Sequence, residues 1–379
     1  MGKVKVTFFL QNLETGGAER STVRLANALN MNIFDVSFLL CKRKGPLLQN
    51  LSKDIKIVDL KKNHVSLSLF KVIRYFKSEK PDIVVSVLDH VNIISILAGL
   101  FCKRKPKIII TERSTFSRVS TYSATKFRNK LISRFLLPYL AKVFYKKADL
   151  IVCVSKGVAD DIVQIIGNLS TIKVIYNPVI GNNFSEFAEE KIENFNVKIK
   201  SLPIIIAVGR LTKAKDYPTL LKAFSLVLKE TPANLLIVGE GEERQRIEKL
   251  IEELDIMENV VLLGFQKNPI KYMVKSDVFV LSSMLEGFPN VLVEAMACGI
   301  PVISTDCQSG PNEIIENGKN GLLVLVSDEK KIAESIIELL KNPELRSKFS
   351  EEGKKRAQYF SIDKSVKEFE NIFKNMLEK

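Results

Sequence analysis

Residues 277–301 read DVFVLSSMLEGFPNVLVEAMACGIP. The apolar run that opens this stretch predicts a buried β-strand, and the apolar residues after Asn290 recur at the spacing of a helix. Gly287 and Pro289 lie between the two patterns and predict a tight loop. The stretch therefore predicts a strand, a loop and the start of a helix, in the order that builds a parallel α/β sheet.

Two carboxylates of this stretch, Glu286 and Glu294, stand on the loop and on the helix pattern. A helix N-terminus offers unpaired backbone N–H groups and the positive end of the helix dipole, and both suit an anion. Helical side chains lean toward the N-terminus, so Glu294 and Asn290 should lie on the face nearest Glu286. We therefore expect one pocket that holds a phosphate on backbone N–H groups and sugar hydroxyls on two carboxylates.

Apolar runs of strand length alternate with amphipathic helix patterns along the whole chain. The candidate strands of the first half are Val4–Leu10, Phe34–Leu40, Ile55–Asp59, Ile83–Val87, Lys107–Thr111, Leu150–Val154 and Ile172–Ile175. Those of the second half are Leu202–Val208, Asn234–Val238, Val260–Leu263, Val278–Leu281, Val302–Ser304 and Leu322–Leu325. Near-continuous apolar strands that alternate with helices predict doubly wound parallel sheets, and two such sets predict two domains.

The stretch 181–201 separates the two sets and carries no strand pattern. We interpret it as a linker between an N-terminal domain at 1–180 and a C-terminal domain at 202–360. Ligands of open α/β sheets bind beyond the carboxyl ends of the strands. With two facing domains, we expect the site in the cleft between them.

The composition is that of an ordinary soluble globular protein, with 379 residues of which 46% are hydrophobic and 26% charged. No apolar run approaches the roughly 20 residues that a membrane-spanning helix needs, and the N-terminus has no signal-peptide pattern. The five cysteines are scattered without disulfide-like or metal-like spacing, which predicts a reducing compartment. With only two histidines, we expect no histidine-based metal site.

The positive charge is concentrated in the first half. Residues 1–180 hold 30 Lys and Arg against 12 Asp and Glu, whereas residues 181–379 hold 27 against 31. This asymmetry predicts an acidic partner for the first half: an anionic membrane surface, a phosphorylated substrate or nucleic acid. The pattern at 126–147 is a basic amphipathic helix, which can lie on an anionic bilayer or simply pack its apolar stripe on the sheet.

Arg210 and Lys215 follow the strand that ends at Val208 and precede a helix pattern with Pro218 in its first turn. Two cations beside a helix N-terminus suit a diphosphate, and Arg can bind two oxygens at once. The alternative to a diphosphate site is a solvated basic loop. The Glu286 segment, which lies in the same half of the chain, favours the diphosphate site.

Glycines follow other strands, at Gly16–Gly17, Gly239–Gly241 and Gly264 before Phe265. Glycine lets backbone approach a ligand, but each group could also be a plain turn. The first pair does not form G-x-G-x-x-G, so a dinucleotide site is not supported. Phe265 could help to frame a flat base.

Glu112 and Arg113 end a strand of the first half. Glu112 could be a site carboxylate or half of a surface ion pair, and these readings stay open. A lone histidine such as His90 is more often structural than catalytic.

These segments together resemble the retaining GT-B glycosyltransferases of family 4, over nearly the whole chain. The likeness is carried by Gly16–Glu19, Gly209–Arg210 with Lys215, Gly239–Gly241, Leu263–Phe265, Glu286–Glu294 and the GPNEII segment at 310–315. Within that family the chain looks like the branch that builds bacterial surface polysaccharides such as lipopolysaccharide, or lipid-linked oligosaccharides.

The resemblance implies two Rossmann-like domains, with a nucleotide-sugar held mainly by the second. The catalytic residues that it implies are Arg210 and Lys215 on the diphosphate, Glu286 by the donor sugar, and Glu112. Glu294 would take the ribose hydroxyls. The remaining donor contacts that it implies are Gly17, Gly209, Gly241, Gly264, Phe265, Gly287, Phe288, Asn290, Val291 and Leu292.

The resemblance also implies a UDP-linked hexose or N-acetylhexosamine donor, no metal cofactor and a lipid-diphosphate-linked glycan as acceptor. We expect a cytoplasmic protein, peripheral on the inner face of the membrane, whose last helix, at about 361–379, packs back on the first domain. Acceptor or membrane contacts are expected at Arg113, Arg118, Lys126, Lys130 and Arg134.

The sequence departs from the family pattern at two points. Glu112 and Arg113 stand where many members have a histidine, and Asp216 stands where glycine is common. A nucleotide-sugar epimerase of the same fold is the nearest rival. A basic nucleic-acid-binding protein is the rival from another class, but no aromatic platform is interleaved with the cations.

Overall fold

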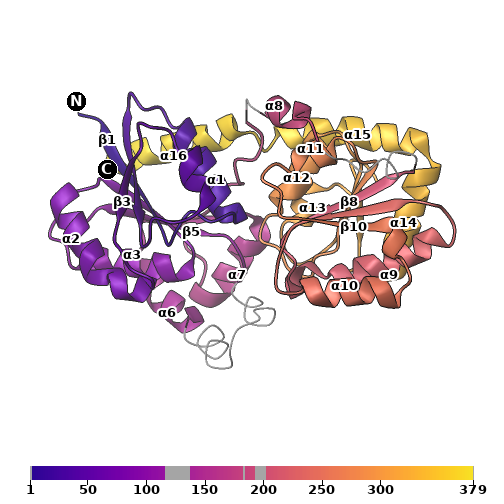
Figure 1. Cartoon of the computed structure of the whole chain (residues 1–379). Coiled ribbons are helices and arrows are strands. Elements are labelled where there is room, and N and C mark those ends of the chain that lie inside the picture. Colours follow the sequence, from indigo (N-terminus) through magenta and orange to yellow (C-terminus); the bar gives the residue numbers. More distant parts are fainter. Residues whose placement is uncertain (1, 116–136, 182–183, 193–201, 379) are drawn as a thin grey trace. The chain divides into compact units, whose positions relative to one another are not determined.

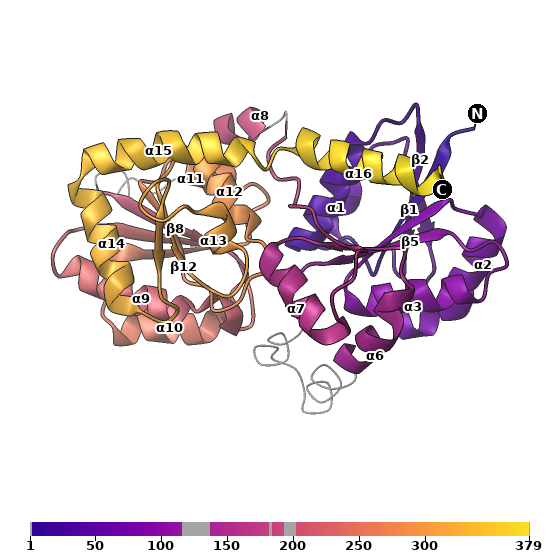
Figure 2. The same cartoon turned by 180° about the vertical axis from the view of Figure 1, so that it is seen from behind.

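The computed structural model (Figures 1 and 2) describes residues 2–115, 137–181, 184–192 and 202–378. They form two compact units. The described residues of the first unit are 2–115, 137–179 and 361–378, and those of the second are 180–181, 184–192 and 202–360. Each unit holds one parallel sheet with helices on both faces. The prediction of two doubly wound parallel-sheet domains is confirmed.

The strands of the first sheet lie in the order β3-β2-β1-β4-β5-β6-β7, and all the observed pairs are parallel. Their bounds are β1 (Val4–Leu10), β2 (Phe34–Leu40), β3 (Lys56–Asp59), β4 (Ile83–Val87), β5 (Lys107–Glu112), β6 (Leu150–Cys153) and β7 (Ile172–Val174). Each forms within two residues of its predicted ends. The near-continuous apolar runs form strands because both faces of this sheet are covered.

Helices cover both faces of the first sheet (Figure 1). They are α1 (Gly17–Ala28), α2 (Leu69–Glu79), α3 (Asp89–Leu100), α6 (Leu137–Phe144), α7 (Lys156–Ile166) and α16 (Ile362–Leu377), with the short 3-10 turns η1 (Pro46–Asn50), η2 (Val65–Ser68) and η4 (Tyr145–Lys147). Phe8 of β1 belongs to the core under α1 and α16, and its neighbour Phe9 belongs to the core under α2 and α3. This alternation is the two-residue period of a strand.

Helix α16 comes from the far end of the chain and packs beside α1 in the first unit (Figure 2). Phe373 is fully buried and meets the Phe34 ring edge-on, with centroids 5.7 Å apart. The Glu370 carboxylate accepts the Asn30 N–H at 2.9 Å, and the Ser365 hydroxyl donates to the Tyr176 carbonyl at 3.0 Å. The last helix is thus an integral layer of the first unit.

The second sheet repeats the same pattern, with the strand order β10-β9-β8-β11-β12-β13. Its strands are β8 (Ile204–Val208), β9 (Asn234–Val238), β10 (Val260–Gly264), β11 (Val278–Leu281), β12 (Val302–Thr305) and β13 (Leu322–Val324). Its helices are α9 (Tyr217–Leu228), α10 (Arg244–Glu253), α11 (Ile270–Met273), α12 (Asn290–Ala297), α13 (Pro311–Ile314), α14 (Glu329–Lys341) and α15 (Pro343–Gln358), with the turns η6 (Lys213–Lys215) and η7 (Met257–Asn259).

Part of the stretch interpreted as a linker is structured. Helix α8 (Phe184–Glu189) forms there and belongs to the second unit. The Asn268 side chain donates to the Phe187 carbonyl at 2.7 Å, and Lys271 pairs with Glu190 at 2.6 Å. These contacts fasten the start of the second unit to helix α11.

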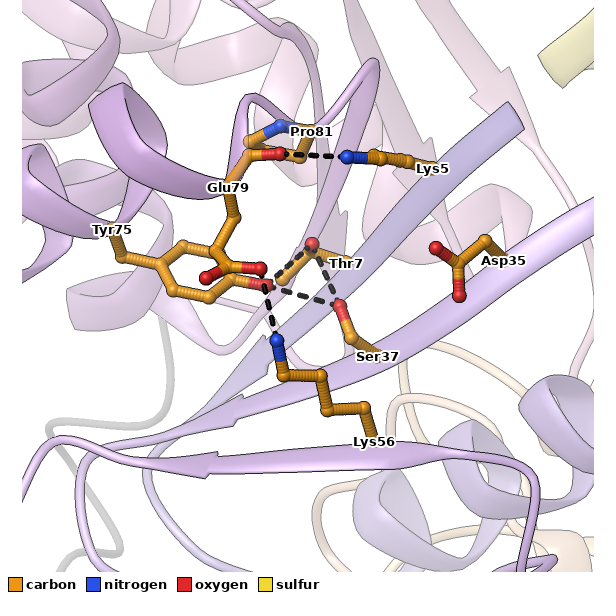
Figure 3. Close-up of a pocket in the computed structure, with 8 residues that line it drawn as sticks. All are labelled: Lys5, Thr7, Asp35, Ser37, Lys56, Tyr75, Glu79 and Pro81. Carbon is orange, nitrogen blue, oxygen red and sulfur yellow. Dashed lines mark hydrogen bonds and ion pairs between the residues drawn. The ribbon is translucent and has the colours of Figure 1, made fainter. Parts of the chain in front are cut away.

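A small cavity of about 50 Å³ lies at the amino half of strands β1 to β3 (Figure 3). The hydroxyls of Thr7, Ser37 and Tyr75 meet there in a triangle with edges of 2.9 to 3.1 Å. Lys56 and Glu79 pair at 2.9 Å beside them. Since these polar groups bond to one another, the cavity is a self-satisfied structural network, at the opposite edge of the sheet from the carboxyl ends of the strands.

The buried ring of Phe373 provides a test of the role of α16. Phe373→Ala should lower the free energy of unfolding of the first unit by about 3–5 kcal/mol, because it leaves a cavity beside Phe34. Urea unfolding followed by hydrogen exchange of the amides of each unit measures this. Leu377→Ala, on the exposed side of the same helix, is the control and should cost less than about 1 kcal/mol. Equal losses in both variants would contradict the role assigned to α16.

Candidate functional site

The strand order of the second sheet reverses direction between the neighbouring strands β8 and β11. The loops that leave the carboxyl ends of these two strands therefore diverge to opposite faces, and the gap between them is where open α/β sheets bind ligands. The loop after β8 carries Arg210 and Lys215, and the loop after β11 carries Glu286. Lys215 and Glu286 thus meet at the switch point, and Arg210 lies on the same loop as Lys215.

Lys215 and Glu286 form an ion pair, with side chains that are 20% and 10% exposed. Glu286 Oε1 accepts both the Lys215 ammonium and the Ser283 hydroxyl, the latter at 2.6 Å. A half-buried pair of this kind is electrostatically stronger than a surface pair, since less water screens it. The Glu286 carboxylate is therefore held in one place, beside a cation that an incoming anion could also bind.

Backbone contacts lock the two loops together. The Ser282 hydroxyl donates to the Lys215 carbonyl at 2.8 Å, and the Met284 N–H donates to the Ala214 carbonyl at 2.8 Å. The Ser309 hydroxyl donates to the Glu286 carbonyl at 2.6 Å. Three serines and backbone groups thus fix the loop positions before any ligand arrives, which is the arrangement that preorganised sites require.

Glycine is required where these loops pack backbone against backbone. Gly239 has a φ of +148°, and a Cβ there would lie 1.9 Å from the Gly209 carbonyl oxygen. A Cβ on Gly241 would lie 2.2 Å from the Leu211 carbonyl oxygen. The glycines after β9 therefore bring that loop against the Arg210 loop, where the Leu211 N–H donates to the Glu240 carbonyl at 3.0 Å.

The GPNEII segment packs against the Glu286 loop. Gly310 has a φ of +96°, and a Cβ there would lie 2.6 Å from Pro289 Cδ and 3.0 Å from the Gly287 carbonyl oxygen. A larger residue would displace the loop that carries the carboxylate. This contact connects the segment to the loop that carries Glu286.

Asp216, the departure from the family pattern, has left-handed backbone with a φ of +45°. Glycine suits such a position best, and Asp is among the residues that tolerate it. The Asp216 carboxylate accepts the Thr219 hydroxyl at 2.7 Å and the Ser327 hydroxyl at 3.2 Å. These bonds hold the turn between Lys215 and helix α9 in the left-handed conformation that glycine would adopt more easily.

The other predicted donor residues of the second unit fall at strand and helix ends. Arg210 and Phe265 are exposed, while Glu294 on α12 is only 6% exposed. Gly264 ends β10 with a φ of +69°. The remaining residues lie after β8 or β9 or in the loop and first turn of α12: Gly209, Gly241, Gly287, Phe288, Asn290 and Val291. Their roles toward a ligand stay predictions.

Leu292, which is predicted to contact the donor, lies inside the core. Its side chain is fully buried and its backbone N–H already donates to the Pro289 carbonyl at 3.0 Å. In this structure, Leu292 supports the start of α12 from inside the core.

The first unit holds a buried polar cluster at the carboxyl ends of β4 and β5. Glu112 is completely buried, and its Oε1 accepts the Asn92 side-chain amide at 2.6 Å and the Tyr145 hydroxyl at 2.5 Å. The Asn92 oxygen in turn accepts the Ser86 hydroxyl at 2.8 Å. Glu112 is thus not half of a surface ion pair, and any effect on a ligand must pass through its neighbours.

Burial and the adjacent Asp89 carboxylate raise the pKa of Glu112 well above its ordinary value. Burial also raises the pKa of Asp89 and, well above its ordinary value, that of Tyr145. Two carboxyls that face each other away from water cannot both ionise cheaply. Burial and the neighbouring carboxyl thus favour a proton on the Glu112–Asp89 pair, and that proton belongs to the pair rather than to one residue.

Two further polar contacts lie near this cluster. His90 Nε2 lies 3.1 Å from the Gln11 side-chain oxygen, and it joins the ends of β1 and β4 at the switch point of the first sheet. Burial lowers the pKa of His90. Arg113 Nη1 donates to the Asn177 side chain, and burial lowers the pKa of Arg113 to about 10. Among the described residues, the buried Arg113 Nε has no hydrogen-bond partner.

Several predicted residues lie elsewhere. Gly17 begins helix α1 in the first unit. Arg118, Lys126, Lys130 and Arg134 lie outside the described residues, so the predicted basic helix is described only from Leu137 onward.

The sequence did not single out Ser283, Ser309, Asn92 and Tyr145, although each bonds to Glu286 or Glu112. Ser283 could have been found, because it stands three residues before Glu286 on the same loop. The other three are 20 to 33 residues from their partners. No local pattern reports contacts over such separations.

Among the residues that the structure describes, no group of three or more His, Cys, Asp or Glu side chains could hold a metal ion. Within the same described residues, no helix is both long and apolar enough to cross a membrane.

The Glu112 carboxyl gives a pH-dependent prediction. Its folded pKa lies above its unfolded value of about 4.3, so the folded state binds the extra proton and the free energy of unfolding falls as pH rises above that value. Glu112→Gln keeps an oxygen for Asn92 and Tyr145 but binds no proton. Relative to the unsubstituted protein, this variant should gain stability between pH 5 and pH 8, as measured by urea unfolding. Exposed Glu378→Gln is the control, and a difference that does not change with pH would contradict the prediction.

Two family models match the chain. The model described as Glycosyltransferase Family 4 matches residues 15–180, and the model described as Glycosyl transferases group 1 matches residues 188–356. The first match covers strands β2 to β7 and the second covers strands β8 to β13.

Curated relatives match over nearly their whole length. One from Campylobacter jejuni, N-acetylgalactosamine-N,N'-diacetylbacillosaminyl-diphospho-undecaprenol 4-alpha-N-acetylgalactosaminyltransferase, is 32% identical over 368 residues, which cover 94% of this chain and 95% of the relative. A second from the same organism, GalNAc-alpha-(1->4)-GalNAc-alpha-(1->3)-diNAcBac-PP-undecaprenol alpha-1,4-N-acetyl-D-galactosaminyltransferase, is 27% identical over 371 residues, or 95% of each chain.

Among solved structures, Anabaena HepE in complex with UDP and glucose superposes with a TM-score of 0.81. The two share 19% sequence identity over 98% of this chain and 100% of the other, so this likeness concerns the fold. Because the 32% identity extends over almost the whole of both chains and both units match glycosyltransferase models, the protein belongs to the GT-B glycosyltransferases, with a family 4 domain followed by a group 1 domain.

Proposed function

We propose that this glycosyltransferase moves a hexose or an N-acetylhexosamine from a UDP-sugar to a lipid-diphosphate-linked glycan, with retention of configuration, in the assembly of a bacterial surface glycan. The observation that carries the donor half of this proposal is the Lys215–Glu286 pair at the switch point of the second sheet. The UDP in the HepE complex supports the donor class. The undecaprenol-diphosphate groups named in the two Campylobacter relatives support the acceptor class.

The polar groups of the second unit match the parts of a nucleotide-sugar. Lys215 and the exposed Arg210 are the cations for the diphosphate, and Arg can bind two phosphate oxygens at once. Glu286 and Glu294 are hydrogen-bond acceptors for the hydroxyls of the sugar and the ribose. The first turn of α12 adds the positive end of a helix dipole close to Glu286.

The bond that breaks in the reaction joins the anomeric carbon of the sugar to a phosphate oxygen, and negative charge grows on the leaving diphosphate. Lys215 and Arg210 would stabilise that charge, which is the electrostatic role that lowers the barrier most in such sites. Because these cations are supplied by the chain itself, we propose that transfer needs no metal. Glu286, held by Lys215 and Ser283, would position the donor sugar.

The acceptor half of the proposal rests on the first unit. Arg113 is a half-buried cation whose buried Nε has no partner among the described residues, and we propose that it binds a phosphate of the acceptor. All five cysteines are free thiols, in agreement with a reducing compartment. We propose a peripheral location on the inner face of the cell membrane, where UDP-sugars and lipid-linked acceptors meet.

Substitution of the cation and of the second carboxylate tests the donor site. Lys215→Ala and Glu294→Ala should each lower kcat for transfer by at least about 100-fold and weaken UDP binding, since each removes a group that contacts the donor. Circular dichroism checks that the fold is intact. The matched control is Lys213→Ala, an exposed lysine in the same 3-10 turn, which should keep its activity. Full activity of Lys215→Ala would contradict the assignment of the donor site.

A screen of donors tests the nucleotide. A ligand at 100 times its Kd adds about 2.7 kcal/mol to the free energy of unfolding, so thermal stabilisation by a panel of UDP- and GDP-sugars should select a UDP-sugar. Labelled donor incubated with and without a lipid-linked acceptor then separates transfer from epimerisation. A new nucleotide-sugar formed without acceptor would favour the epimerase instead, and chelation of divalent metals should leave transfer unchanged.

A further inference from the structure

The end of α3 and the outer side of α6 form a surface of exposed apolar side chains, here called the α3–α6 patch. Leu100 and Phe101 at the end of α3 are 47% and 61% exposed, and Tyr139 and Val143 of α6 are 64% and 43% exposed. Large apolar side chains with this much exposure, on two adjoining elements, mark a surface that contacts something other than water.

Contacts between the two elements bring these residues together. Helices α3 and α6 pack against each other, and α3 also packs against η4. Lys105 Nζ donates to the Lys147 carbonyl at 3.2 Å and pairs with Asp149 at 3.5 Å, so the segment after α3 touches the segment after α6. Figures 1 and 2 show the two helices adjacent in both views.

The orientation of α6 turns Tyr139 and Val143 outward. Ala141 is completely buried, and Tyr139 and Val143 each stand two positions away from it. Two positions correspond to about 200° around a helix, so these side chains lie on the side opposite Ala141. They are one turn apart from each other and share a face.

Exposed cations lie on the same two segments of the chain as the apolar residues. The α3–α6 patch includes five exposed basic side chains, namely Lys103, Arg104, Lys142, Lys146 and Lys147. Arg104 pairs with Asp82 at 2.9 Å but remains 70% exposed. In the described segments 97–107 and 137–149, Asp149 is the one acidic residue, and it is bound to lysines and to the Ile108 N–H.

We propose that the α3–α6 patch docks the protein on the surface of a bilayer that contains anionic lipid. Exposed apolar and aromatic side chains on the same two segments as exposed cations match the interface of such a bilayer, where rings sit at headgroup level and lysines reach the phosphates. The assignment rests on the proposed function in one respect, since a lipid-linked acceptor places the reaction at a membrane.

Two other occupants fit the patch less well. A second copy of this chain would bring the same five cations face to face in a symmetric dimer, and like charges repel. Nucleic acid would satisfy the cations and could stack bases on Phe101 and Tyr139, but it would leave the aliphatic Leu100 and Val143 without an apolar partner. A bilayer satisfies the apolar and the basic side chains together.

Vesicle flotation with the full chain tests the patch. The unsubstituted protein should bind vesicles of phosphatidylcholine with phosphatidylglycerol, bind less in high salt, and bind little to phosphatidylcholine alone. The apolar variant combines Phe101→Ser with Val143→Ser, and the charge variant combines Lys103→Glu, Lys142→Glu and Lys146→Glu. Each should lower the partition coefficient by at least about tenfold.

The matched control changes the second unit in the same way, with Met257→Ser, Lys229→Glu and Lys249→Glu at exposed positions. It should bind vesicles like the unsubstituted protein. Equal binding by the control and by the two patch variants would overturn the proposal, as would binding of a duplex oligonucleotide that the patch substitutions abolish while vesicle binding is absent.

Donor binding separates this proposal from the proposed function. The patch variants should still be stabilised by the UDP-sugar, because none of the substituted residues belongs to the donor site. Vesicle binding that depends on the patch, in a protein that no nucleotide-sugar stabilises, would support the docking surface and overturn the proposed function.

Discussion

The ion pair between Lys215 and Glu286 joins the loops that leave two neighbouring strands of the second sheet. Both strands are buried on both faces, so polar groups can gather only where the strands end. At those ends the ion pair has two effects. It neutralises a cation and a carboxylate that are partly withdrawn from water, and it ties together loops that the reversal of strand order sends apart. The packing of Gly239 against Gly209 and of Gly310 against Gly287 then fixes the loops around the pair.

An ion pair at this position also prepares the site for an anion. Lys215 must give up part of its interaction with Glu286 when a diphosphate binds, but the Ser283 hydroxyl still bonds to the carboxylate. The cost of exchanging partners is therefore smaller than the cost of burying a lone lysine, and the loops need little reorganisation. The pair consequently holds the two loops together and keeps the Lys215 cation in position for the donor.

The sequence predicted the strands well because their apolar runs are long enough to be buried on two faces. The stretch around Phe187 has no clear helix pattern, because helix α8 is only six residues long and exposes most of its side chains. For this reason the sequence alone indicated a linker there. Lys215 and Glu286 could be predicted as site residues because each lies on a loop that follows a strand, and the carboxyl ends of parallel strands meet at one edge of the sheet. The sequence could not settle Glu112, because the contacts that bury this carboxyl come from Asn92 and Tyr145, distant in sequence.

The distribution of charge explains how one chain can serve two anionic ligands. The second half has a small excess of acidic residues, so attraction by net charge cannot concentrate a nucleotide-sugar there. Recognition must instead come from a few cations at fixed positions, which favours a small ligand with two phosphates over an extended polyanion. The first half has the opposite balance, and five of its exposed cations lie just after α3, on α6 and on η4. A diffuse positive surface suits a partner that is itself extended and diffuse, and a membrane is such a partner.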